Sequence, residues 1–318
     1  MTNTKRHPGS SAGERRVATI DIGTNSVLLL VARLDAGGVL QPIEERATIT
    51  RLGEGVDRTR TLAPAAIERT LACLEEYARA IAEHGVTDVA AVGTSAMRDA
   101  SGGDDLRRRA RTILGVEPQT ISGDEEARLT FRGGLSGLAL PPGRVVVFDI
   151  GGGSTEFISG DAETRAQSSG ISLDVGSVRL TERHVKADPP SPEELSAIGD
   201  DIERELAKVP SMKGATLVGV AGTVTTIAAI ARSVDPYDAS KIHGAVLSKR
   251  DVGETAALLA RTKLAERQGL PGLSPKRADV IVAGAALCAA IVRRADASEL
   301  VVSDRGVRWG LAEELAHR

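Results

Sequence analysis

The sequence predicts an α/β protein made of two related halves that face each other across a cleft. Residues 17–32 read as an apolar strand, a glycine-containing turn and a second apolar strand. Residues 145–160 repeat this pattern without a gap, so that Asp149 takes the position of Asp21. Strands alternate with helices in the rest of the chain, which is typical of sheets covered by helices on both faces. The length of 318 residues is enough for two domains.

In the first half, we expect a disordered tail over residues 1–15, followed by the first strand–turn–strand unit. Apolar residues at helical spacing, with Pro64 before them and Gly85 after them, predict a long helix over residues 64–84. A strand over residues 89–92 and a basic helix that contains the arginine-rich run 107–111 come next. We interpret that run as a solvated helix face, and a basic rim for a polyanion is the alternative.

In the second half, the repeated strand–turn–strand unit is followed by a long helix that begins at Ser191. Ser191 is the predicted N-cap, Pro192 lies in the first turn, and Glu194 completes the capping box. Residues 215–231 then read as a strand, a glycine-rich turn and a helix. Residues 274–292 predict a capped apolar helix, and residues 299–315 predict a strand, a turn and a final helix.

The composition excludes several classes of protein. Hydrophobic residues make up 42% of the chain, charged residues 26% and aromatic residues 2%, and the net charge is −3. The scarcity of aromatic rings and of excess basic charge argues against a nucleic-acid partner. The longest uncharged apolar run, residues 280–292, is shorter than the roughly 20 residues that cross a bilayer, so we expect a buried helix and no membrane partner.

The cysteines and histidines show no metal or redox spacing. Cys73 and Cys288 lie in apolar helical patterns, so we expect buried reduced thiols, which suit a cytoplasmic location. None of the five histidines is paired at metal-binding spacing, which favours solvated or structural roles.

The two repeated turns, DIGTNS and DIGGGS, are the main candidates for chemistry. Their small residues allow backbone N–H groups to approach an anion closely, and successive N–H groups form a concavity that holds phosphate oxygens. A single turn of this kind is most often only a tight hairpin, but two turns in matching positions favour a phosphate site. The turn GVAGTVTT is a third candidate, because it leads into a helix N-terminus. The residues predicted to bind phosphate in these turns are Gly23, Thr24, Asn25, Ser26, Gly151, Gly152, Gly153, Ser154, Gly222 and Thr223.

Acidic residues accompany the turns. Asp21 and Asp149 end their strands and are expected to face the same cleft, where carboxylates beside phosphate oxygens require a divalent cation, most naturally Mg²⁺. In SGDEEARL, Ser122 and Glu125 form a predicted capping box. Glu126 has no capping duty, so it is the candidate that accepts a proton from an attacking water, although interaction with the helix dipole is the alternative. Glu156 would orient that water or share the metal, although alone it would read as an exposed strand carboxylate.

Taken together, these motifs make the chain resemble the exopolyphosphatase and guanosine pentaphosphate phosphohydrolase family. The resemblance runs from about Arg16 to the C-terminus, through motifs that keep the order seen in that family. They are VATIDIGTNSV, RLGEGVD, GTSAMRDA, SGDEEARL, VVVFDIGGGSTEF, GSVRLTE, GVAGTVTTIA, KRADVIVAGA and VVSDRGVRWG.

The resemblance implies a fold, a reaction and a set of residues. The fold is the two-domain actin and sugar-kinase superfold, with one domain over residues 16–124 plus 303–318 and the other over residues 125–302. The reaction is Mg²⁺-dependent removal of a terminal phosphate from inorganic polyphosphate or a guanosine polyphosphate. By motif, Glu126 matches the general base, Glu156 the carboxylate that positions water, and Asp149 with DIGGGS the metal and phosphate loop. Arg98 and Arg277 lie in motifs whose cations could bind the phosphate chain.

The chain also departs from the family pattern. Leu28 stands where many members have Arg, which removes a cation from a stretch expected to engage the substrate. The chain looks like the short form, without the helical domains that longer relatives append, and a homodimer is common among relatives. Exopolyphosphatase activity is the leading hypothesis. The alternatives are hydrolysis of guanosine pentaphosphate, a nearly inactive sensor of polyphosphate or nucleotide, and a sugar kinase, which is weakened because no separate catalytic Asp motif is found.

Overall fold

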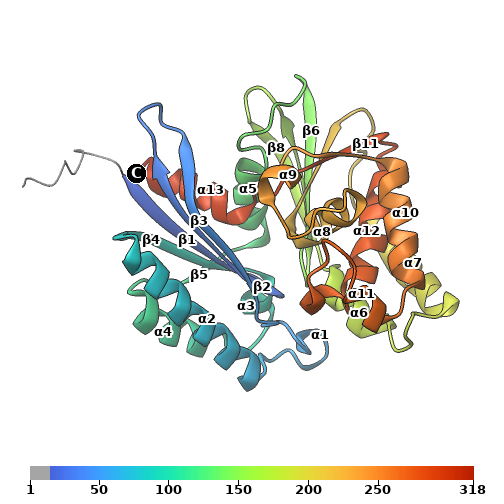
Figure 1. Ribbon diagram of the computed structural model, residues 1–318, viewed down its shortest axis with the longest axis horizontal. Coiled ribbons are helices and arrows are strands. Elements are labelled where there is room, and N and C mark those ends of the chain that lie inside the picture. The colour runs from blue at the N-terminus through green and yellow to red at the C-terminus, as the bar shows by residue number, and fades with distance from the viewer. Residues whose placement is uncertain (1–14) are drawn as a thin grey trace, which may run out of the picture.

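The computed structural model describes residues 15–318, and Figure 1 shows that these form two lobes side by side. The predicted tail lies outside the described residues up to residue 14. Each lobe contains one twisted sheet with helices packed on it, as the sequence predicts. No helix among residues 15–318 combines the length and the apolar character needed to span a bilayer.

The first sheet has five strands in the order β3-β2-β1-β4-β5. Strands β1, β2 and β3 form an antiparallel meander, and β4 and β5 continue the sheet in parallel with β1. The connection between β1 and β2 is the DIGTNS turn. The bounds are β1 (Arg16–Ile22), β2 (Ser26–Leu34), β3 (Leu40–Ile49), β4 (Asp88–Gly93) and β5 (Gln119–Thr120).

The second sheet repeats this order and adds one edge strand. Its order is β10-β11-β9-β6-β7-β8, in which β6, β7 and β8 form the meander and β9 and β11 are parallel to β6. Each sheet therefore has ribonuclease H-like topology, and the duplication confirms the predicted two-domain, actin-like fold class. The bounds are β6 (Arg144–Ile150), β7 (Thr155–Asp161), β8 (Gln167–Leu173), β9 (Thr216–Val220), β10 (Val246–Ser248) and β11 (Glu299–Val302).

Helices of the first lobe confirm the pattern seen in the sequence. The predicted long helix is present as α2, whose apolar face is buried. In α4 every arginine of the run 107–111 has a carboxylate partner, which supports a solvated face rather than a rim for a polyanion. The helices are α1 (Val56–Thr59), α2 (Pro64–Glu83), α3 (Ser95–Asp99) and α4 (Gly103–Leu114).

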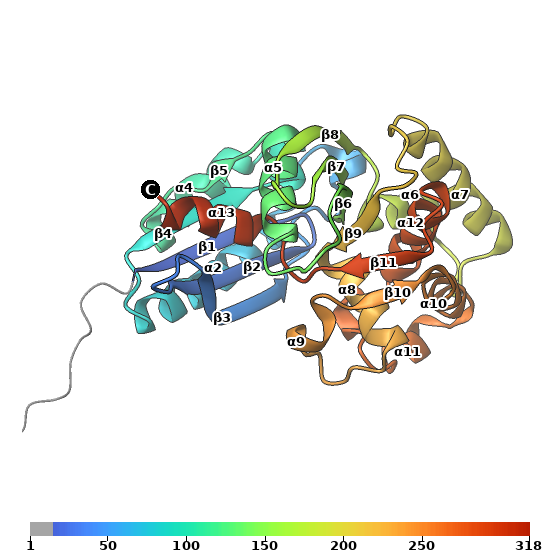
Figure 2. The ribbon, with the colours of Figure 1, turned by 90° about the horizontal axis from the view of Figure 1, so that it is seen from above.

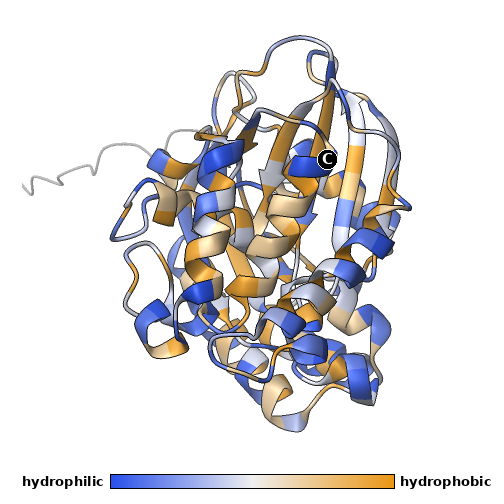
Figure 3. Ribbon diagram, turned by 90° about the vertical axis from the view of Figure 1, so that its right-hand side faces the viewer, coloured by the Kyte–Doolittle hydropathy of each residue, from blue (hydrophilic) through white to orange (hydrophobic). Residues whose placement is uncertain are grey.

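The second lobe contains the larger core. The capping box of Ser191 and Glu194 begins α7 as predicted, and both Cys73 and Cys288 are buried in their respective lobes. Figure 3 views the molecule from the side of this lobe and shows hydrophobic colour along its central strands, whereas its helices carry both hydrophobic and hydrophilic colour. The helices are α6 (Ser177–His184), α7 (Pro192–Leu206), α8 (Ala221–Ala231), α9 (Ala239–Ile242), α10 (Lys249–Arg261), α11 (Leu264–Arg267) and α12 (Ile281–Arg294).

One predicted helix is divided. The sequence predicts a continuous capped helix from residue 274, but residues 275–277 form a 3₁₀ turn, and α12 begins only at Ile281. The Ser274 side chain caps neither segment. Arg277 ends the 3₁₀ turn, and its guanidinium lies against Gly222, because a Cβ added to that glycine would overlap Arg277 Nη1.

Two helices cross between the lobes, α5 (Gly123–Gly134) and α13 (Val307–Ala316), and both views show them side by side (Figures 1 and 2). Helix α13 packs on β1 and β2, whereas α5 packs on β7 and β8. The backbones meet at glycines, since a Cβ added to Gly310 would overlap the Leu129 carbonyl oxygen. The chain thus returns to the first sheet after β11. The proposed domain boundaries at 124/125 and 302/303 stay a prediction.

Candidate active site

The two repeated turns have the same backbone hydrogen bond. The Gly23 N–H donates to the Ser26 carbonyl, and the Gly151 N–H donates to the Ser154 carbonyl, each at 3.0 Å. The sequence repeat is therefore also a repeat of backbone conformation, and both turns connect the first two strands of their sheets.

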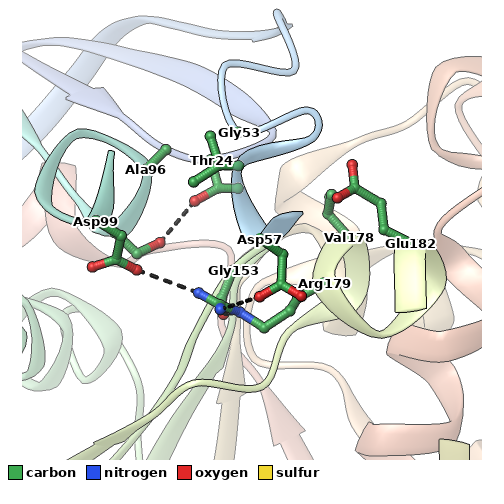
Figure 4. Close-up of a pocket in the computed structure, with 11 residues that line it drawn as sticks. Thr24, Gly53, Asp57, Ala96, Asp99, Gly153, Val178, Arg179 and Glu182 are labelled. Atoms are coloured by element: carbon green, nitrogen blue, oxygen red, sulfur yellow. Dashed lines mark hydrogen bonds and ion pairs between the residues drawn. The ribbon is translucent and has the colours of Figure 1, made fainter. Parts of the chain in front are cut away.

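The tips of the two turns touch each other. A Cβ added to Gly152 would lie 3.0 Å from the Thr24 methyl group, and one added to Gly153 would lie 3.0 Å from Ser95 Oγ. Thr24 Oγ1 and Ser95 Oγ are hydrogen-bonded at 2.7 Å (Figure 4). The glycines of DIGGGS are thus needed for the close approach of the two lobes, in addition to any contact with phosphate.

The third glycine-rich turn joins this region through Arg277. Ala221, at the start of α8, has a φ of 68°, a left-handed conformation that is uncommon for residues other than glycine. The Arg277 guanidinium covers Gly222 and lies 3.4 Å from Ser26 Oγ, so it links a turn of each lobe. Burial lowers the pKa of Arg277. Thr223 is buried in the first turn of α8.

Four carboxylates gather beside these turns. Asp21 and Asp149 lie near the C-terminal ends of β1 and β6, and Glu156 lies opposite Asp149 on β7. Glu126 lies in the first turn of α5 and is 7% exposed. Their mutual influence shows that the structure brings together all four acidic residues predicted from the sequence.

Burial raises the pKa of each of these four groups, and repulsion between carboxylates adds to the shift for Asp21, Asp149 and Glu126. Burial raises the pKa of Asp21 to about 7, and nearby Glu156 also raises it while Arg308 lowers it. Burial, Glu156 and Asp21 raise the pKa of Asp149 well above its ordinary value. Glu126 behaves in the same way, although Arg98 opposes the shift. The cluster is therefore costly to ionise fully unless positive charge joins it.

Two of the carboxylates are held by specific donors. Arg98 Nη1 donates to Glu126 Oε2 and to the Ile121 carbonyl, both at 3.1 Å. Ser172 Oγ donates to Glu156 Oε1 at 2.7 Å. The Arg98 guanidinium, which we expected to bind phosphate, is thus hydrogen-bonded to Glu126. Its phosphate-binding role stays a prediction.

The capping box predicted at the start of α5 is only half formed. Ser122 Oγ accepts from the Glu125 N–H as expected. The Glu125 carboxylate, however, accepts from Arg128 on the next turn of the helix instead of capping Ser122. The prediction of a reciprocal capping box is wrong because a strong, bidentate arginine partner is available three residues later.

The acidic cluster fits a divalent cation only if other ligands complete the site. Among residues 15–318, no three His, Cys, Asp or Glu side chains are arranged to hold a metal by themselves. Asp21 Oδ1 is buried without a hydrogen-bond partner, as a free ligand atom would be. Mg²⁺ commonly uses one or two carboxylates together with waters and substrate phosphates. Asp21, Asp149 and Glu156 are compatible with such a shared site.

A cavity of about 580 Å³ lies between the lobes on one side of the turns. Leu28 lines it, and its register opposite Asp21 matches that of Glu156 opposite Asp149. The first hairpin therefore has an apolar side chain where the second has a carboxylate. Arg277, Tyr237 and Arg308 also line the cavity.

Four further residues of this region have contacts that the sequence motifs do not predict. The buried Arg179 pairs with the partly exposed Asp57 and Asp99, and this cluster joins the lobes (Figure 4). Arg308 is 8% exposed and donates to Glu45. All four residues lie in motifs that carry the family resemblance: Arg179, Asp57, Asp99 and Arg308. These motifs could have pointed to them, but the partners of each residue are distant in the sequence and could not be predicted.

Comparisons with known proteins agree with this architecture. The model of the Ppx/GppA phosphatase family matches residues 30–318. The chain is 39% identical over 317 residues to Exopolyphosphatase 2 of Mycobacterium tuberculosis, covering 95% of this chain and 98% of that protein.

Solved structures are similar over the same extent. The crystal structure of the Aquifex aeolicus member of the Ppx/GppA protein family has a TM-score of 0.81 and 35% sequence identity, covering 95% of this chain and 97% of that chain. The crystal structure of an exopolyphosphatase from Cytophaga hutchinsonii has a TM-score of 0.86 and 25% identity, covering 95% and 98%.

Proposed function

The chain belongs to the Ppx/GppA phosphatase family, and on this premise we propose that it is an exopolyphosphatase that hydrolyses the terminal phosphoryl group of inorganic polyphosphate with the aid of Mg²⁺. The observation that carries this proposal is the position of Glu126 beside Glu156 and Asp21, next to two matching glycine-rich turns. The similarity to Exopolyphosphatase 2 supports the same substrate.

Each part of the site has a task in this reaction. The backbone N–H groups of the two turns would bind the oxygens of the terminal phosphoryl group. Glu126 would accept a proton from the attacking water, and Arg98 would keep its carboxylate in place. Glu156, held by Ser172, would orient that water. Asp21, Asp149 and Glu156 would hold Mg²⁺, which when bound would supply positive charge to offset that of the phosphate oxygens.

A second candidate substrate is guanosine pentaphosphate. The cavity of about 580 Å³ has the size of many small-molecule sites, and its apolar wall at Leu28 is suited to a nucleoside more than to a phosphate chain. Tyr237, which is 46% exposed, adds an aromatic surface at the same cavity. Hydrolysis of the nucleotide would use the same carboxylates and turns.

One assay separates these candidates. Orthophosphate release is measured with long-chain polyphosphate, guanosine pentaphosphate and ATP, each with Mg²⁺ and with a chelator. We expect the highest kcat/KM for polyphosphate and no release with the chelator. Faster release from the nucleotide would move the assignment to the second candidate. Tight Mg²⁺-dependent binding without release would instead indicate a sensor.

A further inference from the structure

We propose that Arg179 is a positioning residue, which fixes the DIGGGS turn against the first lobe in the arrangement that the reaction needs. This inference rests on the proposed function for its catalytic consequence, but its structural part can be tested separately. Arg179 lies on α6, in the second lobe, and is only 6% exposed.

The contacts of Arg179 connect three segments. Its Nε donates to the Gly153 carbonyl at 2.7 Å, in the middle of the turn. Its Nη1 donates to Asp57 Oδ1 at 2.6 Å and its Nη2 to Asp99 Oδ2 at 3.3 Å, and both acceptors belong to the first lobe (Figure 4). One planar guanidinium thus binds the phosphate turn and two carboxylates of the opposite lobe at once, which a lysine could not do.

The position of Gly153 makes this contact consequential. Gly153 lies against Thr24 and Ser95 of the first lobe, so a small rotation of its peptide group would also disturb the contact between the two turns. The N–H groups that would face phosphate are part of the same short turn. Displacement of such groups by about 1 Å can reduce turnover roughly 100-fold.

The α6 backbone also holds the turn, and this provides the competing explanation. The Ser177 N–H donates to the Gly151 carbonyl, and the N–H groups of Val178 and Arg179 donate to the Gly152 carbonyl. If these bonds were sufficient, the Arg179 side chain would only contribute to the stability of the lobe interface. Gly153, however, has its carbonyl bound by the Arg179 side chain and not by these N–H groups.

Arg183 offers a matched control on the same helix. It is more exposed and donates to both oxygens of Asp57, but it does not contact the phosphate turn. The variants Arg179→Gln and Arg183→Gln therefore both remove a cation that pairs with Asp57, and only the first releases Gly153. Arg179→Lys keeps the charge but not the fork of donors.

Two measurements on the full-length variants test the proposal. Hydrogen exchange of the Gly151 amide, which is bonded within the turn, is measured without substrate. We expect Arg179→Gln to exchange roughly tenfold faster than Arg183→Gln. Steady-state phosphate release from polyphosphate with Mg²⁺ is then expected to show kcat reduced about 10- to 100-fold in Arg179→Gln, with a smaller change in KM. Arg179→Lys should give intermediate values.

Equal exchange and equal kcat in the glutamine variants of Arg179 and Arg183 would overturn the proposal. If Arg179→Gln does not fold, as judged by circular dichroism, the comparison of Arg179→Lys with Arg183→Lys decides in the same way. If the wild-type protein releases no phosphate from polyphosphate, the proposed function fails, but the exchange of the Gly151 amide still decides whether Arg179 positions the turn.

Discussion

Glu126 owes its proposed role to its surroundings rather than to its residue type. Its neighbour Glu125 is chemically identical but is held by Arg128 at the surface, where its pKa is lowered mainly by that hydrogen bond. Burial and Glu156 instead raise the pKa of Glu126. Two adjacent glutamates on one helix therefore differ in basicity, and only Glu126 lies beside the two repeated glycine-rich turns.

Substitution of each glutamate tests this difference. We expect Glu126→Gln to lower kcat roughly 10²- to 10⁴-fold, the usual range for loss of a general base. Its thermal midpoint should not fall, because the variant removes a buried group that is costly to ionise. Glu125→Gln should keep turnover near the wild-type value. Similar losses in both variants would show that the helix start, and not the Glu126 carboxylate, matters.

The pH dependence of activity follows from the same carboxylate. A general base works in its deprotonated form, so kcat/KM falls as the pH drops through the pKa of Glu126, which lies well above the ordinary 4.5. Because Arg98 lowers that pKa, we expect Arg98→Met to move the acid limb of the pH profile to higher pH. The position of the limb is read from kcat/KM across the acidic and neutral range. A limb that stays in place contradicts the assignment of Glu126.

At the scale of elements, the site depends on how α5 is held. This helix carries Glu126 in its first turn, and its middle crosses α13 at a point where glycines allow the backbones to touch. A Cβ added to Gly133 would overlap the Gly306 carbonyl oxygen, and one added to Gly310 would overlap the Leu129 carbonyl oxygen. Because the obstacles are backbone atoms, the helices themselves would have to separate.

We therefore expect Gly310→Ala to destabilise the protein by about 1–3 kcal/mol, the usual cost of overpacking, and also to lower kcat by displacing α5. Gly253→Ala is the control, since its Cβ would point into open space on α10. That change should stabilise the protein by about 0.5–1 kcal/mol, because alanine is a better helix former. Urea unfolding measures both effects, and equal stability of the two variants would disprove the tight crossing.

The sequence alone predicted the elements with strong local signals. The hairpins were found through their internal repeat, and α2 through its apolar spacing with Pro64 at its start. Strands β3 and β8 were not predicted, because half-exposed edge strands show little apolar patterning. The break before α12 was not predicted, and the packing of Arg277 on Gly222 beside it is a contact between distant segments that local pattern does not reveal.

The same distinction applies to the candidate site. The convergence of Asp21 and Asp149 followed from the repeat, since equivalent turns of duplicated lobes face each other. The contacts of Arg179 with Asp57, Asp99 and Gly153 could not be derived, because they join segments that only the tertiary fold brings together. Local pattern thus indicates which residues end a strand, but not which cation neutralises which carboxylate.

At the scale of the whole molecule, two kinds of electrostatic interaction act between the lobes. Ion pairs at the lobe interface hold the lobes together, whereas repulsion among the carboxylates in the cleft drives them apart. Arg51 forms a bidentate ion pair with Asp279 across the joint, and the Gly55 N–H donates to Glu182. Inside the cleft, however, Asp21 from the first lobe faces Asp149 from the second, and each carries a raised pKa. Ionisation of this cluster therefore opposes the close arrangement of the lobes that the ion pairs favour.

This balance predicts how pH and Mg²⁺ act together on stability. The pKa of Asp21 is raised from 3.8 to about 7 by folding, so its contribution favours the folded protein below its ordinary pKa and is lost as the pH rises through about 7. Protons and a cation both relieve the repulsion, and they compete for the same oxygens.

We expect Mg²⁺ to raise the Tm more at about pH 8 than at about pH 5.5, because fewer protons then occupy the carboxylate oxygens. Asp149→Asn should raise the Tm of the metal-free protein at the higher pH and should reduce the increment from Mg²⁺. Calorimetry with Mg²⁺ or a chelator measures these shifts without any substrate, and a Mg²⁺ increment that is as large at the lower pH would remove the carboxylate cluster as the cation site.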